Sequence, residues 1–337
     1  MRSLSYFLSL SLLTLVGFLS ANAQVNQPRE RPLFPIEQNR KWGYIDSHGS
    51  IVIQPHYQQA LSFSEGLAPV ETEGKWGYID QTDNLRIKPQ FNIAGLFHDG
   101  LARVQINDKW GFIDKTGDLV IKPQFEMVFD FSDGLARIIV DKKSGFIGNT
   151  GKIKIAPQFE TAYSFSEGLA NVYLNGKHAF IDKTGRMIIP LQFSIANSFH
   201  EGLASAMIGD DIGSGKWGFI DKSGQFVIGP TFGVAGDFHE GLAPVALEFR
   251  KQGYVDKTGS IVFTIECDVS GFFVDGMAQV EIGGKHGFID RSGQLVVPVK
   301  FDEVRSFSGG LAWVRLGKEY GYIDKAGKFL WKAKLPN

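Results

Sequence analysis

Apolar and polar residues alternate with a period of two along much of the chain, which is the pattern of half-buried β-strands. In LARVQIN (101–107), Ala102, Val104 and Ile106 would share one face, while polar side chains would share the other. No stretch in the repeated part of the chain shows helical periodicity, and Gly and Pro occur at short intervals throughout it. The pattern therefore predicts an all-β protein.

Two more strands are predicted after this one. KWGFID (109–114) follows a tight turn, and LVIKPQF (119–125) follows the hairpin turn KTGD (115–118). The proline in the third segment ends that strand or marks it as an edge. We interpret EMVFDFSDG (126–134) as a return loop, so that each unit is a three-stranded antiparallel meander.

This unit recurs. The glycine of K-W-G returns at steps of 34 residues, with one step of 39 and one of 35, and alanine replaces it once: Gly43, Gly77, Gly111, Gly145, Ala179, Gly218, Gly253, Gly287 and Gly321. A second motif, FSEGLA at 63–68, recurs in parallel with it. Self-similarity at a fixed period indicates a repeat architecture of about nine units.

Both faces of the middle strand are apolar. In WGFID, Trp110 and Phe112 point one way, and Gly111 and Ile113 the other. A sheet that is apolar on both faces needs cover on both, and the next unit supplies it. We expect the glycine to lie where the neighbouring sheet comes close. The prediction is a face-to-face array that stays open as a superhelical solenoid, because the two ends are in phase and no blade is split to latch a ring. The alternative is a closed β-propeller.

The N-terminal residues have a different character. Arg2, an apolar run of about 16 residues and Ala21-Asn22-Ala23 are typical of a secretory signal peptide cleaved after Ala23. The alternative is an uncleaved anchor helix. We predict a signal peptide at 1–23, a linker at 24–32 and the repeat domain at 33–337. The protein would be exported to the periplasm or the extracellular space, with no membrane span in the mature chain.

Composition excludes several kinds of partner. Lys and Arg number 35 and Asp and Glu 36, a balance that argues against binding nucleic acid or anionic lipid. Cys267 is the only cysteine, so disulfides and cysteine zinc sites are excluded, and its place in the repeat predicts a core residue. No catalytic constellation or cofactor motif is present, and we predict a protein that is not an enzyme and holds no cofactor or metal.

Acidic residues occupy two repeated positions. One set precedes the hairpin turn: Asp46, Asp80, Asp114, Asp182, Asp221, Asp256, Asp290 and Asp324. These carboxylates are predicted to accept turn N–H groups, and a calcium ladder is the weaker alternative. The other set lies in the FSEGLA motif, where a second turn is expected: Glu65, Asp99, Asp133, Glu167, Glu201, Glu240 and Asp275.

Histidines also recur in register. His98, His200 and His239 share the position after Phe in the FSEGLA motif, where a solvent-exposed loop is expected; a shared metal or a pH-sensitive pair at His200 and His239 is the alternative. His178 and His286 replace the tryptophan of K-W-G and are expected to fill its packing site.

The positions that vary between repeats are the candidates for binding. In the first strand, the two polar-face sites after L-A differ from unit to unit, while the framework repeats. Because a repeat array binds through such a row, we expect it to be exposed and to carry the contacts. The predicted anchors are the aromatic and arginine residues of the row and its surroundings: Arg103, Arg137, Tyr173, Trp313, Arg315 and Trp331.

The motifs K-W-G-[YF]-I-D-x-x-G and F-[SH]-[ED]-G-L-A resemble the WG, or KWG, repeat of bacterial proteins, over residues 33–331. The resemblance implies a β-rich repeat protein whose copy number varies, and it supplies no catalytic residues. A shorter likeness links the G-K-W hairpins to choline-binding repeats of bacteria.

The expected function is an exported, non-enzymatic scaffold for protein–protein interaction through the variable row. The alternative is a cell-wall or glycan-binding module that uses Trp42, Trp76, Trp110 and Trp217. The partner would be an unidentified protein or a glycan of the cell envelope.

Overall fold

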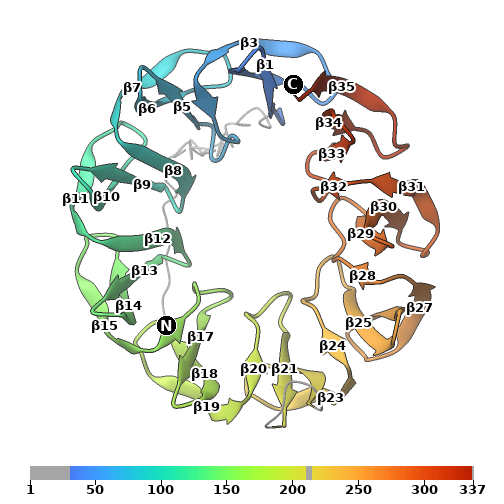
Figure 1. The fold of residues 1–337 in the computed structure, drawn as a ribbon. Coiled ribbons are helices and arrows are strands. Elements are labelled where there is room, and N and C mark those ends of the chain that lie inside the picture. The colour runs from blue at the N-terminus through green and yellow to red at the C-terminus, as the bar shows by residue number, and fades with distance from the viewer. Residues whose placement is uncertain (1–30, 210–214, 336–337) are drawn as a thin grey trace, which may run out of the picture. The chain divides into compact units, whose positions relative to one another are not determined.

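The computed structural model describes residues 31–209 and 215–335, and every regular element within these ranges is a β-strand. The strands form nine antiparallel sheets, here called blades 1 to 9 in chain order, which surround a central opening (Figure 1). Residues 32–337 make up one unit. No helix in the described part of the chain has the length and hydropathy to cross a membrane.

The first five blades are built as follows. Blade 1 has three strands, β1 (Phe34–Gln38), β2 (Lys41–Ile45) and β3 (Ile51–Tyr57). The next four have four strands each: β4 (Gln59–Ala60), β5 (Ala68–Thr72), β6 (Lys75–Ile79), β7 (Leu85–Phe91); β8 (Ile93–His98), β9 (Leu101–Ile106), β10 (Lys109–Ile113), β11 (Leu119–Phe125); β12 (Met127–Ser132), β13 (Leu135–Val140), β14 (Lys143–Gly148), β15 (Ile153–Phe159); β16 (Thr161–Ala162), β17 (Leu169–Leu174), β18 (Lys177–Asp182), β19 (Met187–Phe193).

Blades 6 to 9 repeat the four-stranded plan: β20 (Ile195–Ala196), β21 (Ala204–Ile208), β22 (Lys216–Ile220), β23 (Phe226–Phe232); β24 (Val234–Ala235), β25 (Ala243–Glu248), β26 (Lys251–Val255), β27 (Ile261–Glu266); β28 (Val269–Ser270), β29 (Met277–Ile282), β30 (Lys285–Asp290), β31 (Leu295–Phe301); β32 (Glu303–Val304), β33 (Ala312–Leu316), β34 (Glu319–Ile323), β35 (Phe329–Lys334). In each four-stranded blade the first strand lies nearest the central opening (Figure 1).

The predicted three-stranded unit is wrong for eight of the nine blades. The segment expected to be a return loop supplies a fourth, innermost strand, as β12 does when it pairs with β13. In six blades this strand is only two residues long, for example β4. A segment this short contains no period-two pattern, and the segment is therefore indistinguishable from a loop in the sequence.

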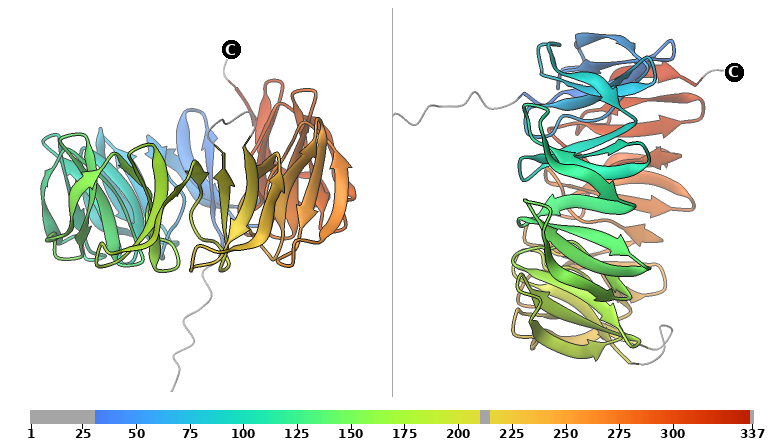
Figure 2. Two further views of the ribbon diagram at one scale, coloured as in Figure 1. Left: turned by 90° about the horizontal axis from the view of Figure 1, so that it is seen from below. Right: turned by 90° about the vertical axis from the view of Figure 1, so that its left-hand side faces the viewer.

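The predicted open array is also wrong, because the blades close into a ring, which is the arrangement of a nine-bladed β-propeller (Figures 1 and 2). Closure follows from the two-sided apolar blades. An open array would leave one apolar face bare at each end, whereas the ring packs blade 1 against blade 9. Phe34, Ile36 and Ile45 of blade 1 form one buried cluster with Leu311 and Tyr322 of blade 9.

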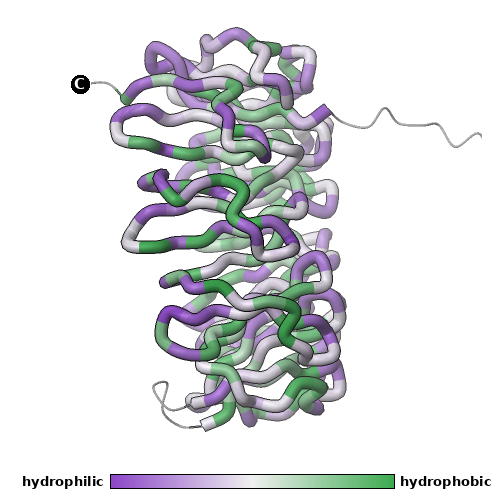
Figure 3. The backbone as a smooth tube through the Cα atoms, turned by 90° about the vertical axis from the view of Figure 1, so that its right-hand side faces the viewer, coloured by the Kyte–Doolittle hydropathy of each residue, from purple (hydrophilic) through white to green (hydrophobic). Residues whose placement is uncertain are grey.

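The core consists of such clusters, one between each pair of neighbouring blades. Between blades 2 and 3, Tyr78 and Phe91 pack with Phe97 and Val104, and the rings of Tyr78 and Phe97 lie 5.0 Å apart. Equivalent aromatic pairs recur around the ring, such as Phe112 with Phe131. Apolar segments accordingly run through the strands and polar ones gather at the turns (Figure 3).

The repeated glycine allows a close approach, but within its own blade. A Cβ on Gly77 would lie 2.5 Å from the carbonyl oxygen of Ile87 in the adjacent strand β7. The register of β6 and β7 shifts at this point, so that Gly77 is passed over between Trp76 and Tyr78. The expectation that the glycine faces a neighbouring sheet is therefore corrected: it accommodates a bulge in the outermost strand.

The acids before the hairpin turns are turn caps, as predicted. Asp114 Oδ1 accepts the backbone N–H of Thr116 at 2.9 Å and that of Asp118 at 3.1 Å. The hydroxyl of Thr116 also donates to Asp114, and this bond, with the N–H groups, holds the pKa of Asp114 below its ordinary value. The described residues contain no group of three or more side chains suited to a metal ion.

The second set of acids joins the blades. The carboxylate of Asp133 in blade 4 accepts the N–H of Gly168 in blade 5 at 2.6 Å. The preceding Ser132 hydroxyl donates to the carbonyl oxygen of Phe165 in blade 5. The same carboxylate–glycine bond, which we call the clamp, links each blade from 2 to 8 with the next: Glu65–Gly100, Asp99–Gly134, Asp133–Gly168, Glu167–Gly202, Glu201–Gly241, Glu240–Gly276 and Asp275–Gly310.

The clamp is missing where the ring closes, and both of its halves are replaced. Gly309 takes the acid's place in blade 9, and Pro32, which has no N–H, takes the glycine's place in blade 1. The two positions face each other, since a Cβ on Gly309 would lie 2.7 Å from Pro32 Cβ. We call this junction between blades 9 and 1 the seam.

Two tyrosines complete the seam instead. In blade 2 the two residues that flank the innermost strand, Gln58 and Leu61, donate their N–H groups to the carbonyl oxygens of Glu71 and Pro69. The described part of blade 1 contains no such strand, and the equivalent oxygens of Pro35 and Glu37 accept the hydroxyls of Tyr322 at 3.0 Å and Tyr320 at 3.2 Å. Burial raises the pKa of Tyr322 to about 12, so its hydroxyl stays a proton donor at neutral pH.

We predict that Tyr322→Phe lowers the free energy of unfolding by about 1–3 kcal/mol, because the Pro35 carbonyl loses its donor. Tyr44→Phe is the matched control, since Tyr44 makes the corresponding bond to Leu61 and five other repeats carry phenylalanine at this position: Phe112, Phe146, Phe180, Phe219 and Phe288. Urea unfolding measures both. Equal losses in the two variants would contradict a special role for the seam tyrosine.

We also predict that the protein loses stability in acid. Burial raises the pKa of Glu65, but hydrogen bonds from Lys115 and Gly100 outweigh it and leave the pKa below its ordinary value; Glu201 behaves alike with Lys257 and Gly241. A depressed folded-state pKa adds stability above the unfolded pKa, and this stability is lost as pH falls through the folded pKa. The melting temperature should therefore fall between about pH 5 and pH 3, and less steeply in Glu65→Gln/Glu201→Gln. Identical slopes would exclude the clamps as the cause.

Candidate binding site at the ring seam

A hollow lies beside β1, which is the first strand of blade 1 in the described part of the chain, and we call this hollow the seam cleft. It has two lobes, with volumes of about 540 Å³ and 370 Å³, and Glu37 and Tyr320 line both. Trp331 lies in the larger lobe, and Trp42 and Trp313 in the smaller one. Cavities of this size suit small ligands or short segments of a polymer.

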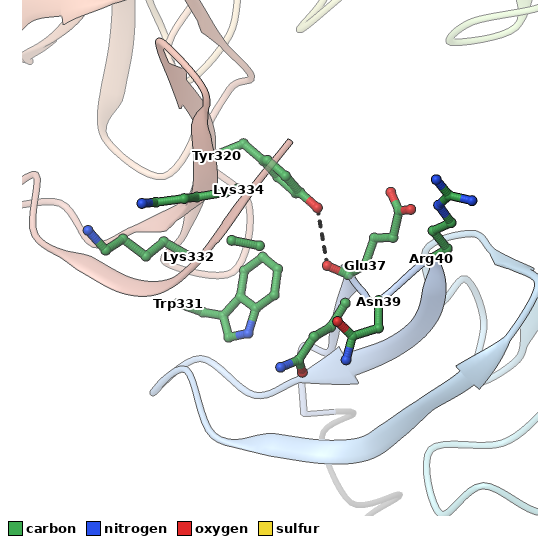
Figure 4. Close-up of a pocket in the computed structure, with 9 residues that line it drawn as sticks. Glu37, Asn39, Arg40, Tyr320, Trp331, Lys332 and Lys334 are labelled. Atoms are coloured by element: carbon green, nitrogen blue, oxygen red, sulfur yellow. Dashed lines mark hydrogen bonds between the residues drawn. The ribbon is translucent and has the colours of Figure 1, made fainter. Parts of the chain in front are cut away.

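Aromatic side chains form much of the cleft wall. The ring centroid of Tyr320 lies 6.3 Å from that of Trp313 and 6.1 Å from that of Trp331. All three side chains are half-buried, so each keeps part of its surface free. Figure 4 shows Tyr320 and Trp331 on blade 9 opposite Glu37, Asn39 and Arg40 on blade 1.

These rings are present because the sequence of the last repeat differs from that of the other repeats at their positions. Tyr320 stands where four of the nine repeats have the tryptophan of K-W-G. Trp331 pairs with Tyr322 as Ile121 pairs with Phe112, so it replaces the isoleucine of I-K-P-Q-F. Strand β35 also pairs with β34 without the bulge next to the repeated glycine.

Charged side chains surround the aromatic wall. Arg315 pairs with Glu303 at 2.5 Å and with Asp302 at 3.5 Å, and Lys332 pairs with Glu319 at 3.1 Å. The Arg315–Glu303 hydrogen bond raises the pKa of Arg315, so the guanidinium is permanently charged. The cleft can therefore combine flat apolar surfaces with donors and acceptors, which is an arrangement for binding.

Three of the six predicted anchors meet at this cleft. Trp313 and Arg315 line the smaller lobe and Trp331 the larger one. The other three do not join them, because Arg103, Arg137 and Tyr173 belong to blades 3, 4 and 5.

Each of these three is engaged locally. Arg103 pairs with Asp130 of the next blade at 2.9 Å, and the Arg137 guanidinium lies 3.4 Å from the centre of the Phe129 ring. Tyr173 lies against His178, with 4.9 Å between ring centroids. Whether these three residues bind a partner stays a prediction.

The variable row was expected to be exposed along its whole length, and this expectation is wrong at two positions. Asn171 and Ser205 are buried, and their side chains bond to Ala196 and Asp237 of the following blades. Because these two positions lie between blades, the variation there reflects the packing of each blade against the next one. Sequence reasoning missed Tyr320, Glu37 and Arg305; the loss of the K-W-G tryptophan at position 320 was the available signal.

The framework tryptophans are packed into the ring. Trp76 is buried, while Trp42, Trp110 and Trp217 are half-buried against the clusters between blades. His178 is buried and bonds to Asn171, so it fills the tryptophan site as predicted. Cys267 is a buried core residue, also as predicted, and burial raises the pKa of its thiol to about 11.

Two of the three histidines of the FSEGLA motif lie side by side, while His98 lies in blade 3, 3.9 Å from Asp130. The rings of His200 and His239 lie 5.1 Å apart, and Phe272 stacks on His239 at 4.2 Å. Asp237 lies 3.8 Å from His200. Burial lowers the pKa of His239, so it is mostly neutral at pH 7.

These features define a class of protein, the repeat β-propeller, in which tandem sequence repeats build the successive blades. A model of the family described as WG containing repeat matches eight segments: 42–76, 76–110, 110–143, 145–177, 179–210, 217–248, 253–285 and 287–320. The chain belongs to this WG-repeat family, as the quoted motifs indicated. A comparison with curated proteins gives no match.

Solved structures with a similar fold are distant in sequence. A eukaryotic initiation factor aligns with a TM-score of 0.64 and 9% identity, over 90% of this chain and 96% of that one. BamB from Moraxella catarrhalis aligns at 0.42 and 12%, over 74% and 90%. Hsv2 from Kluyveromyces lactis aligns at 0.42 and 6%, over 66% and 89%. At these identities the likeness concerns the fold alone.

Proposed function

We propose that this WG-repeat propeller is a non-enzymatic binding protein whose seam cleft holds a carbohydrate chain. The observation that carries the proposal is the cleft itself, where Trp313, Tyr320 and Trp331 keep half-buried faces beside charged side chains. Aromatic faces stack on the apolar C–H surfaces of sugar rings, and carboxylates and guanidinium groups bond to sugar hydroxyls.

Of the four framework tryptophans, Trp42 lines the seam cleft, and the proposal moves glycan binding away from Trp76, Trp110 and Trp217. Trp76 is 8% exposed, too little to stack on a ligand without a change in the fold. It also departs from the scaffold hypothesis, because Asn171 and Ser205 of the variable row are buried between blades. A protein partner therefore becomes an outcome of the test.

We further propose that the protein acts outside the cytoplasm. The support is the N-terminal sequence, with its cationic start, apolar run and Ala21-Asn22-Ala23 ending. The predicted signal peptide and almost all of the predicted linker lie outside the described residues. Edman or mass-spectrometric analysis of the exported protein would show Gln24 as the first residue.

The test of binding is co-sedimentation of the purified protein with insoluble cell-wall polysaccharide. Trp313→Ala should weaken saturable binding by at least about tenfold, since truncating a central aromatic hot spot costs about 2 kcal/mol or more and about 1.4 kcal/mol is tenfold. Trp110→Ala is the control, because Trp110 is a half-buried framework tryptophan of blade 3 that does not line the cleft. Circular dichroism and melting curves confirm that both variants are folded.

Equal losses in the two variants would contradict the seam cleft and return attention to the framework tryptophans. Absence of binding by the wild type would contradict a polysaccharide ligand. Cross-linking of a protein to residues near Arg103 or Arg137 in envelope extracts would then favour the scaffold hypothesis.

A further inference from the structure

We infer that the seam cleft selects an anionic carbohydrate, of the kind built from uronic acids. This inference rests on the proposed function and adds the chemical class of the ligand. It follows from the balance of paired and unpaired charges around the cleft, from the placement of one arginine on the aromatic wall and from the absence of that arginine in the other blades.

The cations of the cleft outnumber its free acids. Arg315 and Lys332 have carboxylate partners, as described above, whereas Arg40, Arg305 and Lys334 form no ion pair within the described residues. Among the acids that line the cleft, Glu303 is paired with Arg315 and only Glu37 has no cation partner in the described chain. The unpaired charges are therefore three positive and one negative, which favours a negatively charged ligand.

Arg305 combines charge with the aromatic wall. Its guanidinium carbon lies 5.1 Å from the centre of the Trp313 ring, within the range of a cation–π contact. Stacking holds the planar group in one orientation and leaves its edge N–H groups without a carboxylate. A carboxylate on a sugar ring stacked in the cleft could accept two parallel hydrogen bonds from such a fork.

The cation belongs to the seam and not to the repeat. The position of Arg305 in the innermost strand region is occupied in the other blades by uncharged residues: Leu61, Gly95, Phe129, Tyr163, Asn197, Gly236 and Gly271. The packing of the repeated framework therefore does not explain why an arginine occupies this position in blade 9. Its register sets it in blade 9, where it lines the smaller lobe of the seam cleft.

A flat, partly apolar ligand is favoured over an acidic peptide. The cleft runs between half-buried tryptophan and tyrosine faces, and the edge carbonyls of Pro35 and Glu37 in β1 already accept tyrosine hydroxyls. A peptide that added as a fourth strand would have to displace these bonds. A sugar ring can stack on the aromatic faces without displacing them.

The experiment compares two oligosaccharides with the same sugar backbone, one with free carboxylates and one in which a methyl group on each carboxylate removes the charge. Calorimetry measures the binding of tetragalacturonate and of its methyl ester to the full protein at low salt. The acid should bind at least about tenfold more tightly than the ester, and its affinity should fall as salt is added, because screening weakens the charge interactions.

Matched variants separate charge from stacking. Arg305→Gln/Lys334→Gln should reduce the affinity for the acid by about tenfold or more and leave that for the ester unchanged. Lys88→Gln/Lys122→Gln removes the same charge from exposed positions in the outermost strands and should change neither affinity. Trp313→Ala should weaken both ligands.

Each result has a distinct meaning. Equal binding of the acid and the ester, with dependence on Trp313, would overturn the inference and leave the proposed function intact. An unchanged acid affinity in Arg305→Gln/Lys334→Gln would also overturn it. If neither oligosaccharide binds, the inference fails together with carbohydrate binding. If oligoglutamate of equal length competes with tetragalacturonate at equal concentration, the site recognises acidic peptides, and the assignment to carbohydrate is wrong.

Discussion

The need to cover two apolar faces on every blade determines the rest of this structure. Tyr78 and Ile79 are successive residues of one strand that point to opposite faces, and both are completely buried. A blade of this kind is stable only between two others. The ring meets the requirement for all nine blades, whereas any open array would expose one such face at each end, so closure is favoured even without a shared blade to fasten the termini.

Closure without a shared blade places a special demand on the first and last repeats. The described part of blade 1 has no innermost strand to bond to the carbonyl oxygens of Pro35 and Glu37, and two tyrosine hydroxyls of blade 9 bond to them instead. The clamp, which joins the other blades from 2 to 9, is absent on both sides of the seam, at Gly309 and Pro32. The seam is held by apolar packing and phenol hydroxyls, and the same arrangement leaves the cleft open.

Much of this organisation is present in the sequence, and the exceptions have physical reasons. The 34-residue period, the two-sided apolar strands and the capping role of residues such as Asp114 depend on local spacing, which a sequence displays directly. The innermost strand was missed because Gln59 and Ala60 are too few to show a period. The partner of Gly77 was misassigned because a bulge in the adjacent strand cannot be read from alternation. Ring closure was missed because it depends on the rotation between blades, to which no single residue corresponds.

The candidate site was predictable in part because its residues differ from those at the same positions in the other repeats. Trp313, Arg315 and Trp331 stood out against the repeat, and the structure brings them together at the seam. Arg103 and Arg137 stood out equally, but a neighbouring blade covers their position in a complete part of the ring. The difference is that the blade after Trp313 and Arg315 has three strands in the described part of the chain, whereas the blades after Arg103 and Arg137 have four.

The clamp has a consequence for how such a chain can grow by gene duplication. Each internal repeat supplies a carboxylate that can accept the glycine N–H of the following blade. It also supplies a glycine N–H that can donate to the carboxylate of the preceding blade. A copied internal repeat therefore arrives with both halves of its new junctions, and its neighbours need no compensating change. The terminal repeats cannot be copied in this way, because Gly309, Pro32 and Tyr320 are adapted to one another. Internal repeats can multiply by simple duplication, while the two ends must evolve as a pair.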